Sequence, residues 1–407
     1  MLDASTRQQV KATAPILKQH GVLLTSHFYQ RMFQHNPELK NIFNQGHQHA
    51  GQQQQALAMA VAAYAEHIDA PEVLLPVLER VAHKHTSLGI RAEHYPIVGK
   101  HLLASIREVL GEEAAPDSLL DAWGAAYQQL AELLINLENS LYQRAATQAG
   151  GWSGWRPFRV VNKQVESAEI TSFYLQPADG GALPDFQPGQ YVSVQRYIPE
   201  WGLCQPRQYS LSDAPGKGWL RISVKREEAQ GDAPAGKVSG QLHAALAEGD
   251  ILQVSPPFGD FVLHQDRATP VVLISAGVGQ TPLLSMLRHL LESGSQRPIR
   301  YLHAARHGQV HAMKQEVGQL AAQHPVLAST VFYECPQDTD QLGQDYQRAG
   351  RIDAEAIREH ALLADADYYL CGPQAFMQQQ RSQLRASGVA ATRIHMEVFG
   401  SNAMASD

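Results

Sequence analysis

The spacing of apolar residues changes twice along the 407-residue chain. From residue 1 to about residue 146, apolar side chains recur every three or four positions among abundant Ala, Leu and Gln, which predicts helices. Between residues 158 and 263, short β-branched or aromatic runs are separated by turn signals such as Pro188-Gly189, which predicts antiparallel strands. From residue 269 onward, apolar runs alternate with helical segments, which predicts a parallel sheet in an α/β arrangement.

These three patterns of apolar residues predict a multidomain protein, because 407 residues are more than a domain with a single hydrophobic core usually contains. The expected order is an all-α domain, a glycine-rich linker, an antiparallel β-barrel, an α/β domain with a parallel sheet, and a mobile tail. The corresponding ranges are 1–147, 148–157, 158–264, 265–400 and 401–407. Within the α/β domain, the pattern predicts strands at 271–275, 299–303 and 368–370 and helices at 282–291 and 375–384.

Composition narrows the classes of partner. The net charge of -7 argues against nucleic acid or an anionic membrane. No apolar run approaches a membrane span and the first residues lack a signal-peptide layout, so we expect a cytoplasmic protein without membrane insertion. Cys204, Cys335 and Cys371 are far apart and form no CxxC pair, which excludes a disulfide framework and a thiolate metal site. We expect a monomer.

The segment from Leu74 to Leu88 carries the first candidate for chemistry. Its apolar residues share one helical face with His85, whereas His83 points nearly the opposite way and is expected at the surface. A histidine inside an apolar stripe is more often a core residue than a metal ligand. Ligation becomes the better interpretation only if other polar groups converge on the same place.

Three other predicted helices supply such groups. Tyr29 lies on an apolar face with Met32, Gln53 lies on one with Leu57, and Glu138 ends the apolar stripe of the last predicted helix. Each of the three has an ordinary interpretation: a phenol at a rim, an amide at the surface, a carboxylate at a helix end. Together they would provide two hydrogen-bonding groups on one side of a ligand and an acid on the other.

The same segments resemble the globin domain of flavohemoglobins. The similarity runs from Phe28-Tyr29 through Asn36-Pro37-Glu38-Leu39 to Phe43, then Gln53 and Leu57, then Lys84-His85-Thr86-Ser87. The resemblance implies that His85 is the proximal iron ligand of heme b. It also implies that Phe43 packs on the heme, that Tyr29 and Gln53 line the distal pocket, which Leu57 narrows, and that Tyr95 and Glu138 lie beside the proximal imidazole. A carboxylate hydrogen-bonded to the imidazole makes it more basic, which favours oxygen activation.

The barrel region contains a pattern similar to the FAD site of the ferredoxin-reductase superfamily. Its centre is Arg207-Gln208-Tyr209-Ser210, where a guanidinium suits a pyrophosphate and a phenol ring can stack on a flavin. The resemblance adds Tyr191 after Gly189-Gln190, then Lys237, Val238 and Ser239 at an expected helix start, and Phe399 in the terminal Glu397-Val398-Phe399-Gly400. The loop 229–235 is longer than that family's pattern.

The α/β region carries a glycine-rich turn for a nucleotide. The strand 271–275 leads into Gly277, Val278, Gly279, Gln280, Thr281 and Pro282, where glycine permits close backbone approach and a helix N-terminus favours phosphate. The sequence is GxGxTP rather than GxGxxG, and the next strand ends in His303-Ala304-Ala305-Arg306 without an acidic residue. With Cys371, Gly372 and Pro373 downstream, it resembles the NAD(P)H domain of the same superfamily.

The resemblance covers residues 2–400 and implies an NAD(P)H-dependent nitric oxide dioxygenase. NAD(P)H would reduce FAD, FAD would pass single electrons to heme, and NO and O2 would combine to nitrate there. Arg306 would suit the 2′-phosphate of NADPH, but an exposed arginine needs no ligand, so we expect NADH. A lipid is a further candidate ligand of the distal pocket.

Two other functions are compatible with the sequence. One is an oxygen or nitric oxide sensor whose reductase keeps the iron ferrous; the lack of an output domain and the presence of Glu138 argue against it. The other is a general NAD(P)H reductase that acts on lipid hydroperoxides or ferric chelates. Turnover with nitric oxide in the presence and absence of oxygen separates these functions.

Overall fold

The computed structural model describes residues 2–46, 51–229, 231 and 234–399. The chain divides into two compact units, one with residues 1–155 and 193–207 and the other with residues 156–192 and 208–399. The expected mobile tail lies outside the described residues, as do residues 230, 232 and 233 of the long loop. Among the described helices, none is long and apolar enough to cross a membrane.

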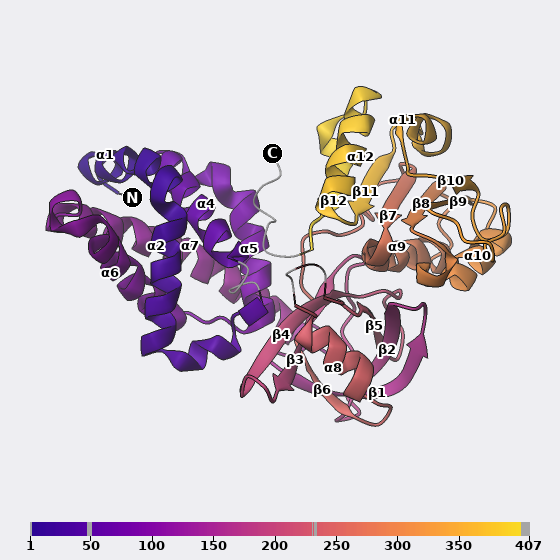
Figure 1. The fold of residues 1–407 in the computed structure, drawn as a ribbon, viewed down its shortest axis with the longest axis horizontal. Helices are drawn as coiled ribbons and strands as arrows, with labels where there is room; N and C mark the ends of the chain where they lie inside the picture. Colours follow the sequence, from indigo (N-terminus) through magenta and orange to yellow (C-terminus); the bar gives the residue numbers. More distant parts are fainter. Residues whose placement is uncertain (1, 47–50, 230, 232–233, 400–407) are drawn as a thin grey trace. The chain divides into compact units, whose positions relative to one another are not determined.

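The described part of residues 2–147 is helical, as the apolar spacing predicts (Figure 1). Prolines mark several starts: Pro37 and Pro71 open short 3-10 helices, and Pro116 precedes the last long helix. Gly89 ends the helix that carries His85 in a left-handed conformation with φ of 80°. The elements are α1 (Ala4–Ala12), α2 (Ala14–His35), η1 (Pro37–Asn41), α4 (Gln52–Glu66), η2 (Pro71–Leu74), α5 (Leu75–Leu88), α6 (His94–Ala114) and α7 (Asp117–Thr147).

The next region is the expected antiparallel barrel. Its six-stranded sheet has the order β4-β3-β6-β1-β2-β5. A bridge between Leu211, directly after β4, and Ile222 of β5 connects the two edges of this sheet, which closes it. The elements are β1 (Arg156–Val165), β2 (Ile170–Pro177), β3 (Tyr191–Ile198), β4 (Leu203–Ser210), β5 (Leu220–Lys225), α8 (Lys237–Ala245) and β6 (Ile251–Val254).

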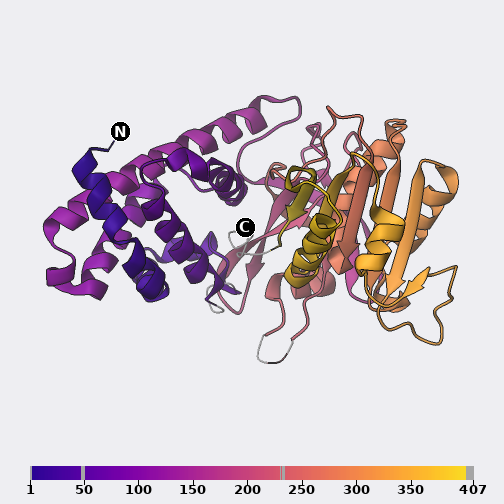
Figure 2. The same ribbon diagram turned by 90° about the horizontal axis from the view of Figure 1, so that it is seen from above.

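The C-terminal region is the predicted α/β domain, whose sheet and flanking helices are seen in Figure 2. Its parallel sheet has the order β10-β9-β8-β7-β11-β12. Separate apolar clusters cover its two faces, one with α9 and α10 and one with α12. The predicted strands and helices are confirmed, and β9, β10, β12 and α10 are additional. The elements are β7 (Val271–Ala276), η3 (Gly277–Gly279), α9 (Gln280–Glu292), β8 (Ile299–Ala305), η4 (Gly308–Val310), α10 (Lys314–Gln323), β9 (Leu327–Tyr333), β10 (Arg348–Ala349), α11 (Ala354–Ala356), η5 (Ile357–Ala361), β11 (Asp367–Cys371), α12 (Gln374–Ala386), η6 (Ala391–Arg393) and β12 (Ile394–Glu397). The exact domain boundaries stay a prediction.

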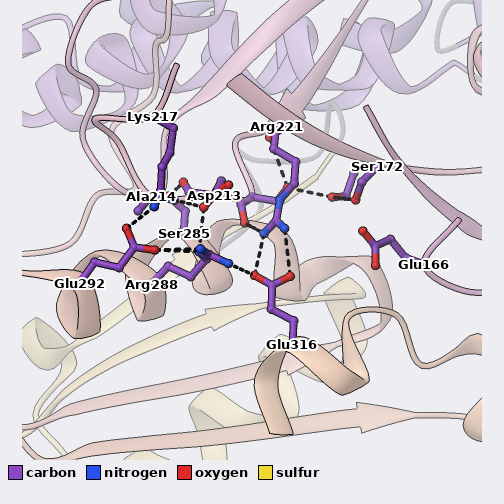
Figure 3. A network of polar contacts seen from close by, with 12 residues as sticks. Glu166, Ser172, Asp213, Ala214, Lys217, Arg221, Ser285, Arg288, Glu292 and Glu316 are labelled. Atoms are coloured by element: carbon purple, nitrogen blue, oxygen red, sulfur yellow. Dashed lines mark hydrogen bonds and ion pairs between the residues drawn. The ribbon is translucent and has the colours of Figure 1, made fainter. Parts of the chain in front are cut away.

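Charged side chains join the barrel to the α/β domain (Figure 3). Arg221 of β5 has a side chain only 3 % exposed and donates to both carboxylate oxygens of Glu316 on α10, at 2.9 and 3.2 Å. Arg288 of α9 also pairs with Glu316 and lies 2.7 Å from Asp213. Since a buried charge is costly unless it is paired, these contacts compensate the buried Arg221 guanidinium.

Candidate functional site

Three helices of the first unit bring His85, Tyr95 and Glu138 together. Nδ1 of His85 on α5 lies 2.8 Å from Oε1 of Glu138 on α7 and 3.2 Å from the Tyr95 hydroxyl on α6. The Tyr95 hydroxyl donates to the same Glu138 oxygen at 2.5 Å. The Glu138 side chain is only 2 % exposed. The arrangement therefore places a buried carboxylate against one nitrogen of the imidazole.

Protonation follows from these contacts. Burial, reinforced by the neighbouring Glu138, raises the pKa of Tyr95 far above its ordinary value, so the phenol keeps its proton and donates it. The carboxylate can only accept, so Nδ1 of His85 carries a proton toward Glu138. The remaining nitrogen, Nε2, then presents its lone pair to a metal.

Tyr29 on α2 is a second candidate site residue, and it lies in the apolar core of the same unit. It is buried, and its ring packs against Phe28, Phe33 and Phe43 at centroid distances of 4.9, 5.9 and 5.8 Å. Its hydroxyl makes no hydrogen bond to any residue in the described ranges. Burial raises the pKa of Tyr29 well above its usual value, so the phenol is a donor. A phenol on a buried ring, with no protein acceptor for its proton, fits a ligand that accepts a hydrogen bond.

The other residues expected around heme lie in the same unit as His85. Phe43 and Leu57 pack against the same apolar cluster as Tyr29. Gln53 lies half-buried in the first turn of α4. His83 is half-buried rather than at the surface, and it does not share the Glu138 contact. With a histidine Nε2 and an unpaired phenol available, the residues present fit a heme.

The segments expected to bind FAD lie at strand and helix ends. Arg207 to Ser210 form the end of β4, and Tyr191 begins β3. Lys237, Val238 and Ser239 form the first turn of α8, where backbone N–H groups lack intrahelical partners and suit a phosphate. The Ser239 hydroxyl is used within the loop, since it accepts from the Glu227 N–H and donates to the Gly236 carbonyl. Phe399 is 44 % exposed after β12.

The nucleotide turn and the Cys371-Gly372-Pro373 motif meet at one edge of the parallel sheet. Gly277 has φ of 55°, and a Cβ on Gly279 would come within 2.3 Å of the Cys371 carbonyl oxygen. Thr281 fastens the turn by donating to the Val278 carbonyl at 3.0 Å. Gln280, Thr281 and Pro282 begin α9, so its N-terminus opens at this edge. This geometry fits a dinucleotide pyrophosphate.

Buried polar residues behind this edge were not identified from the sequence. Ser275, at the end of β7, lies 2.8 Å from Nδ1 of the fully buried His303. The His303 ring stacks on that of His311, which lies 2.9 Å from the Tyr333 hydroxyl. A histidine at the end of an apolar strand is the signal that could have located this cluster.

Comparisons with known proteins agree with this geometry. Residues 26–134 match the globin family, and residues 273–382 match the oxidoreductase NAD-binding domain family. The chain is 65 % identical over 402 residues to the flavohemoprotein of Chromobacterium violaceum, which covers 99 % of each chain. It is 63 % identical over 406 residues to that of Bordetella pertussis, which covers 100 % of each.

Two solved structures extend the likeness. The flavohemoglobin of Malassezia yamatoensis, determined with bound FAD and heme, has a TM-score of 0.85 and 30 % identity and covers 98 % of this chain and 100 % of its own. The FAD/NAD-binding domain of the nitric oxide dioxygenase of Vibrio cholerae has a TM-score of 0.55 and 42 % identity and covers 60 % of this chain and 98 % of its own.

Fold, site and relatives together define an oxidoreductase in which a heme-binding globin is joined to an FAD- and NAD(P)H-binding reductase. The chain belongs to the flavohemoproteins.

Proposed function

We propose that the protein is an NAD(P)H-dependent nitric oxide dioxygenase, which converts NO and O2 to nitrate. The observation that carries this proposal is the 2.8 Å contact between Glu138 and Nδ1 of His85. A carboxylate partner makes an imidazole ligand more basic, which favours oxygen activation over reversible storage. When bound, the heme would supply the reaction site, and FAD with NAD(P)H would supply the electrons.

The residues of the globin unit would then have separate roles in binding the heme and lining its pocket. His85 would hold the iron through Nε2, and Tyr95 keeps Glu138 in place by donating to it. Tyr29 and Gln53 supply polar groups on the distal side, where the burial of Tyr29 keeps its phenol protonated. Phe43 and Leu57, which pack with Tyr29, give the pocket its apolar walls.

The reductase residues would bind and orient the electron donors. FAD is proposed to contact Tyr191, Arg207, Gln208, Tyr209, Ser210, Lys237, Val238, Ser239 and Phe399. NAD(P)H is proposed to contact the turn from Gly277 to Pro282 and the segment from Cys371 to Pro373. The relative from Vibrio cholerae, whose reductase domain is described as part of a nitric oxide dioxygenase, supports this division of labour.

The test is NO consumption by the holoprotein with NADH, with and without O2. Fast consumption only with O2, with nitrate as the product, is expected. Glu138→Gln should slow this consumption by about tenfold, the effect seen when partners of metal ligands are replaced. Glu132→Gln is the matched control, because Glu132 is exposed on the same helix and bonds only to Gln128 among the described residues. Equal consumption without O2, or wild-type rates in Glu138→Gln, would contradict the proposal.

A further inference from the structure

In a dinucleotide-binding domain of this kind, the residues at the end of the strand that corresponds to β8 contact the adenine ribose. β8 lies next to β7, the strand that leads into the glycine-rich turn. In such folds, an acidic residue near the end of the second strand bonds the 2′-hydroxyl of NAD, whereas an arginine accepts the 2′-phosphate of NADP. This chain has Arg306 directly after β8 and no acidic residue in that strand. Taken alone, that would favour NADPH.

Arg306 already has a carboxylate partner. Its Nη2 forms an ion pair with Glu169, which lies in the turn between β1 and β2 of the barrel. The Glu169 side chain is 27 % exposed, against 56 % for Arg306, so the carboxylate is the more enclosed of the two. The acidic group missing from β8 is therefore present at its end, contributed by the other domain of the same unit.

Backbone contacts fix Glu169 at this position. Its N–H and that of Ile170 donate to the Ser167 hydroxyl at 3.3 and 3.1 Å, and its carbonyl accepts from the Arg226 N–H at 2.8 Å. The Ala168 N–H donates at 2.9 Å to the carbonyl of Gln309, three residues beyond Arg306. The turn is thus attached to the loop that follows β8.

The charged network in Figure 3 joins the same two domains at a second place. Arg221 lies on β5, the strand paired with β2, and its partner Glu316 lies on α10, the first α-helix after β8. The turn is thus joined to the loop by the Ala168–Gln309 hydrogen bond, and the two domains that carry them are joined again by the Arg221–Glu316 pair. The Glu169 carboxylate therefore occupies a place set by the fold, rather than one it reaches only as a mobile surface side chain.

We propose that Glu169 supplies from the barrel the acidic group that the end of β8 lacks, and that it thereby selects NADH over NADPH. The carboxylate neutralises Arg306 and would repel a 2′-phosphate, while it can accept hydrogen bonds from ribose hydroxyls. This specificity role depends on the NAD(P)H-binding module alone and not on the reaction at the heme.

Binding of adenosine nucleotides to the holoprotein, measured by calorimetry, tests the role without any turnover. The probes are 5′-AMP and adenosine 2′,5′-bisphosphate, which differ only in the 2′-phosphate. Glu169→Gln should raise the affinity for the bisphosphate relative to 5′-AMP by about tenfold, because it frees Arg306 for a charge-assisted contact. The ratio of kcat/KM for NADPH over NADH in anaerobic flavin reduction should rise in parallel.

Three variants complete the design. Arg306→Ala removes the positive charge that pairs with Glu169. It should weaken binding of the bisphosphate, whereas Glu169→Gln should strengthen it. Glu169→Asp keeps the charge and should keep the preference for 5′-AMP. Asp179→Asn removes an exposed carboxylate that pairs with Arg156 at the other end of the β1–β2 pair, and should change neither affinity. The proposal is overturned if the ratio of the affinities for the bisphosphate and for 5′-AMP in Glu169→Gln stays within about twofold of wild type, which is a difference of less than about 0.4 kcal/mol. It is also overturned if the substitution changes both affinities equally.

Discussion

Gly279 lies directly against the carbonyl group of Cys371, so that the glycine-rich turn and the Cys371-Gly372-Pro373 segment are in backbone contact. A methyl group on Gly279 would come within 2.3 Å of the Cys371 oxygen, 2.4 Å of its carbonyl carbon and 2.6 Å of the Gly372 nitrogen. All three are backbone atoms, which cannot swing aside as a side chain can. Two motifs whose contacting residues, Gly279 and Cys371, are 92 positions apart thus form one surface.

Gly279→Ala should weaken NADH binding by about tenfold, because forcing the two backbones apart costs about 1–3 kcal/mol. Calorimetric titration of NADH into the holoprotein measures this, while the heme and flavin absorption bands should be unchanged. Gly318→Ala is the control: nothing lies within 4 Å of a Cβ at this position on α10, so the variant should bind normally. Normal NADH affinity in Gly279→Ala would show that the turn does not form the nucleotide site.

His85→Ala should abolish stable heme binding, whereas His83→Ala should retain it. His85 has the Glu138 carboxylate beside Nδ1, which leaves Nε2 for iron, and the histidine that contacts Glu138 is His85 rather than His83. The Soret absorption of protein reconstituted with hemin distinguishes the two variants. The reverse pattern, with heme lost from His83→Ala alone, would mean that the helical register assigned to α5 is not the one that binds heme.

Tyr29→Phe should speed O2 release from the ferrous protein by about tenfold or more, because a hydrogen bond to a charged acceptor contributes roughly 1.5–3 kcal/mol. The substitution keeps the ring contacts with Phe28, Phe33 and Phe43 and removes only the hydroxyl. Flash photolysis gives the rate. In the control Tyr64→Phe, the lost hydroxyl donates to the Ala126 carbonyl instead, so stability should fall slightly and O2 release should not change. An unchanged release rate in Tyr29→Phe would move the distal role to Gln53.

Glu316→Gln should lower the free energy of unfolding of the reductase unit by about 3 kcal/mol, because it leaves the buried Arg221 without a full countercharge. Glu292→Gln is the matched control within the same network (Figure 3). Glu292 pairs with Arg288 and Lys217 but is 34 % exposed, so its loss should cost about 1 kcal/mol or less. Urea unfolding measures both variants, and equal losses would contradict the prediction.

Acid should destabilise the α/β domain through His303 and His311. Burial lowers the pKa of His311 to about 3 and that of His303 well below its usual range. In the unfolded chain these histidines take up protons near pH 6.5, so the folded state loses stability as pH falls below that value. Each contributes a slope of at most about 1.4 kcal/mol per pH unit. Urea unfolding between pH 7 and pH 5.5 should show a smaller slope in His311→Gln; an unchanged slope would exclude this histidine as a cause.

The sequence predicted the fold class and the residue faces better than the contacts between distant segments. The three- and four-residue spacing placed His85 and Glu138 on apolar faces, and strand patterns located β7, β8 and β11, because a local period reports the environment of an element. No local pattern reports which partner a charged residue meets. Arg221 and Glu316 are 95 positions apart, and each alone is typical of a solvated surface. The Glu169 contact with Arg306 was inaccessible for the same reason.

His85, Tyr95 and Glu138 come from α5, α6 and α7, and the contacts that join them span 10, 43 and 53 positions. During synthesis the carboxylate emerges last, so the contact between His85 and Glu138 cannot form until α7 has left the ribosome as far as Glu138. The reductase half contributes none of these three side chains. The contacts of His85 are therefore completed only with the N-terminal helices, and heme capture by nascent chains of increasing length would test whether heme binding needs them.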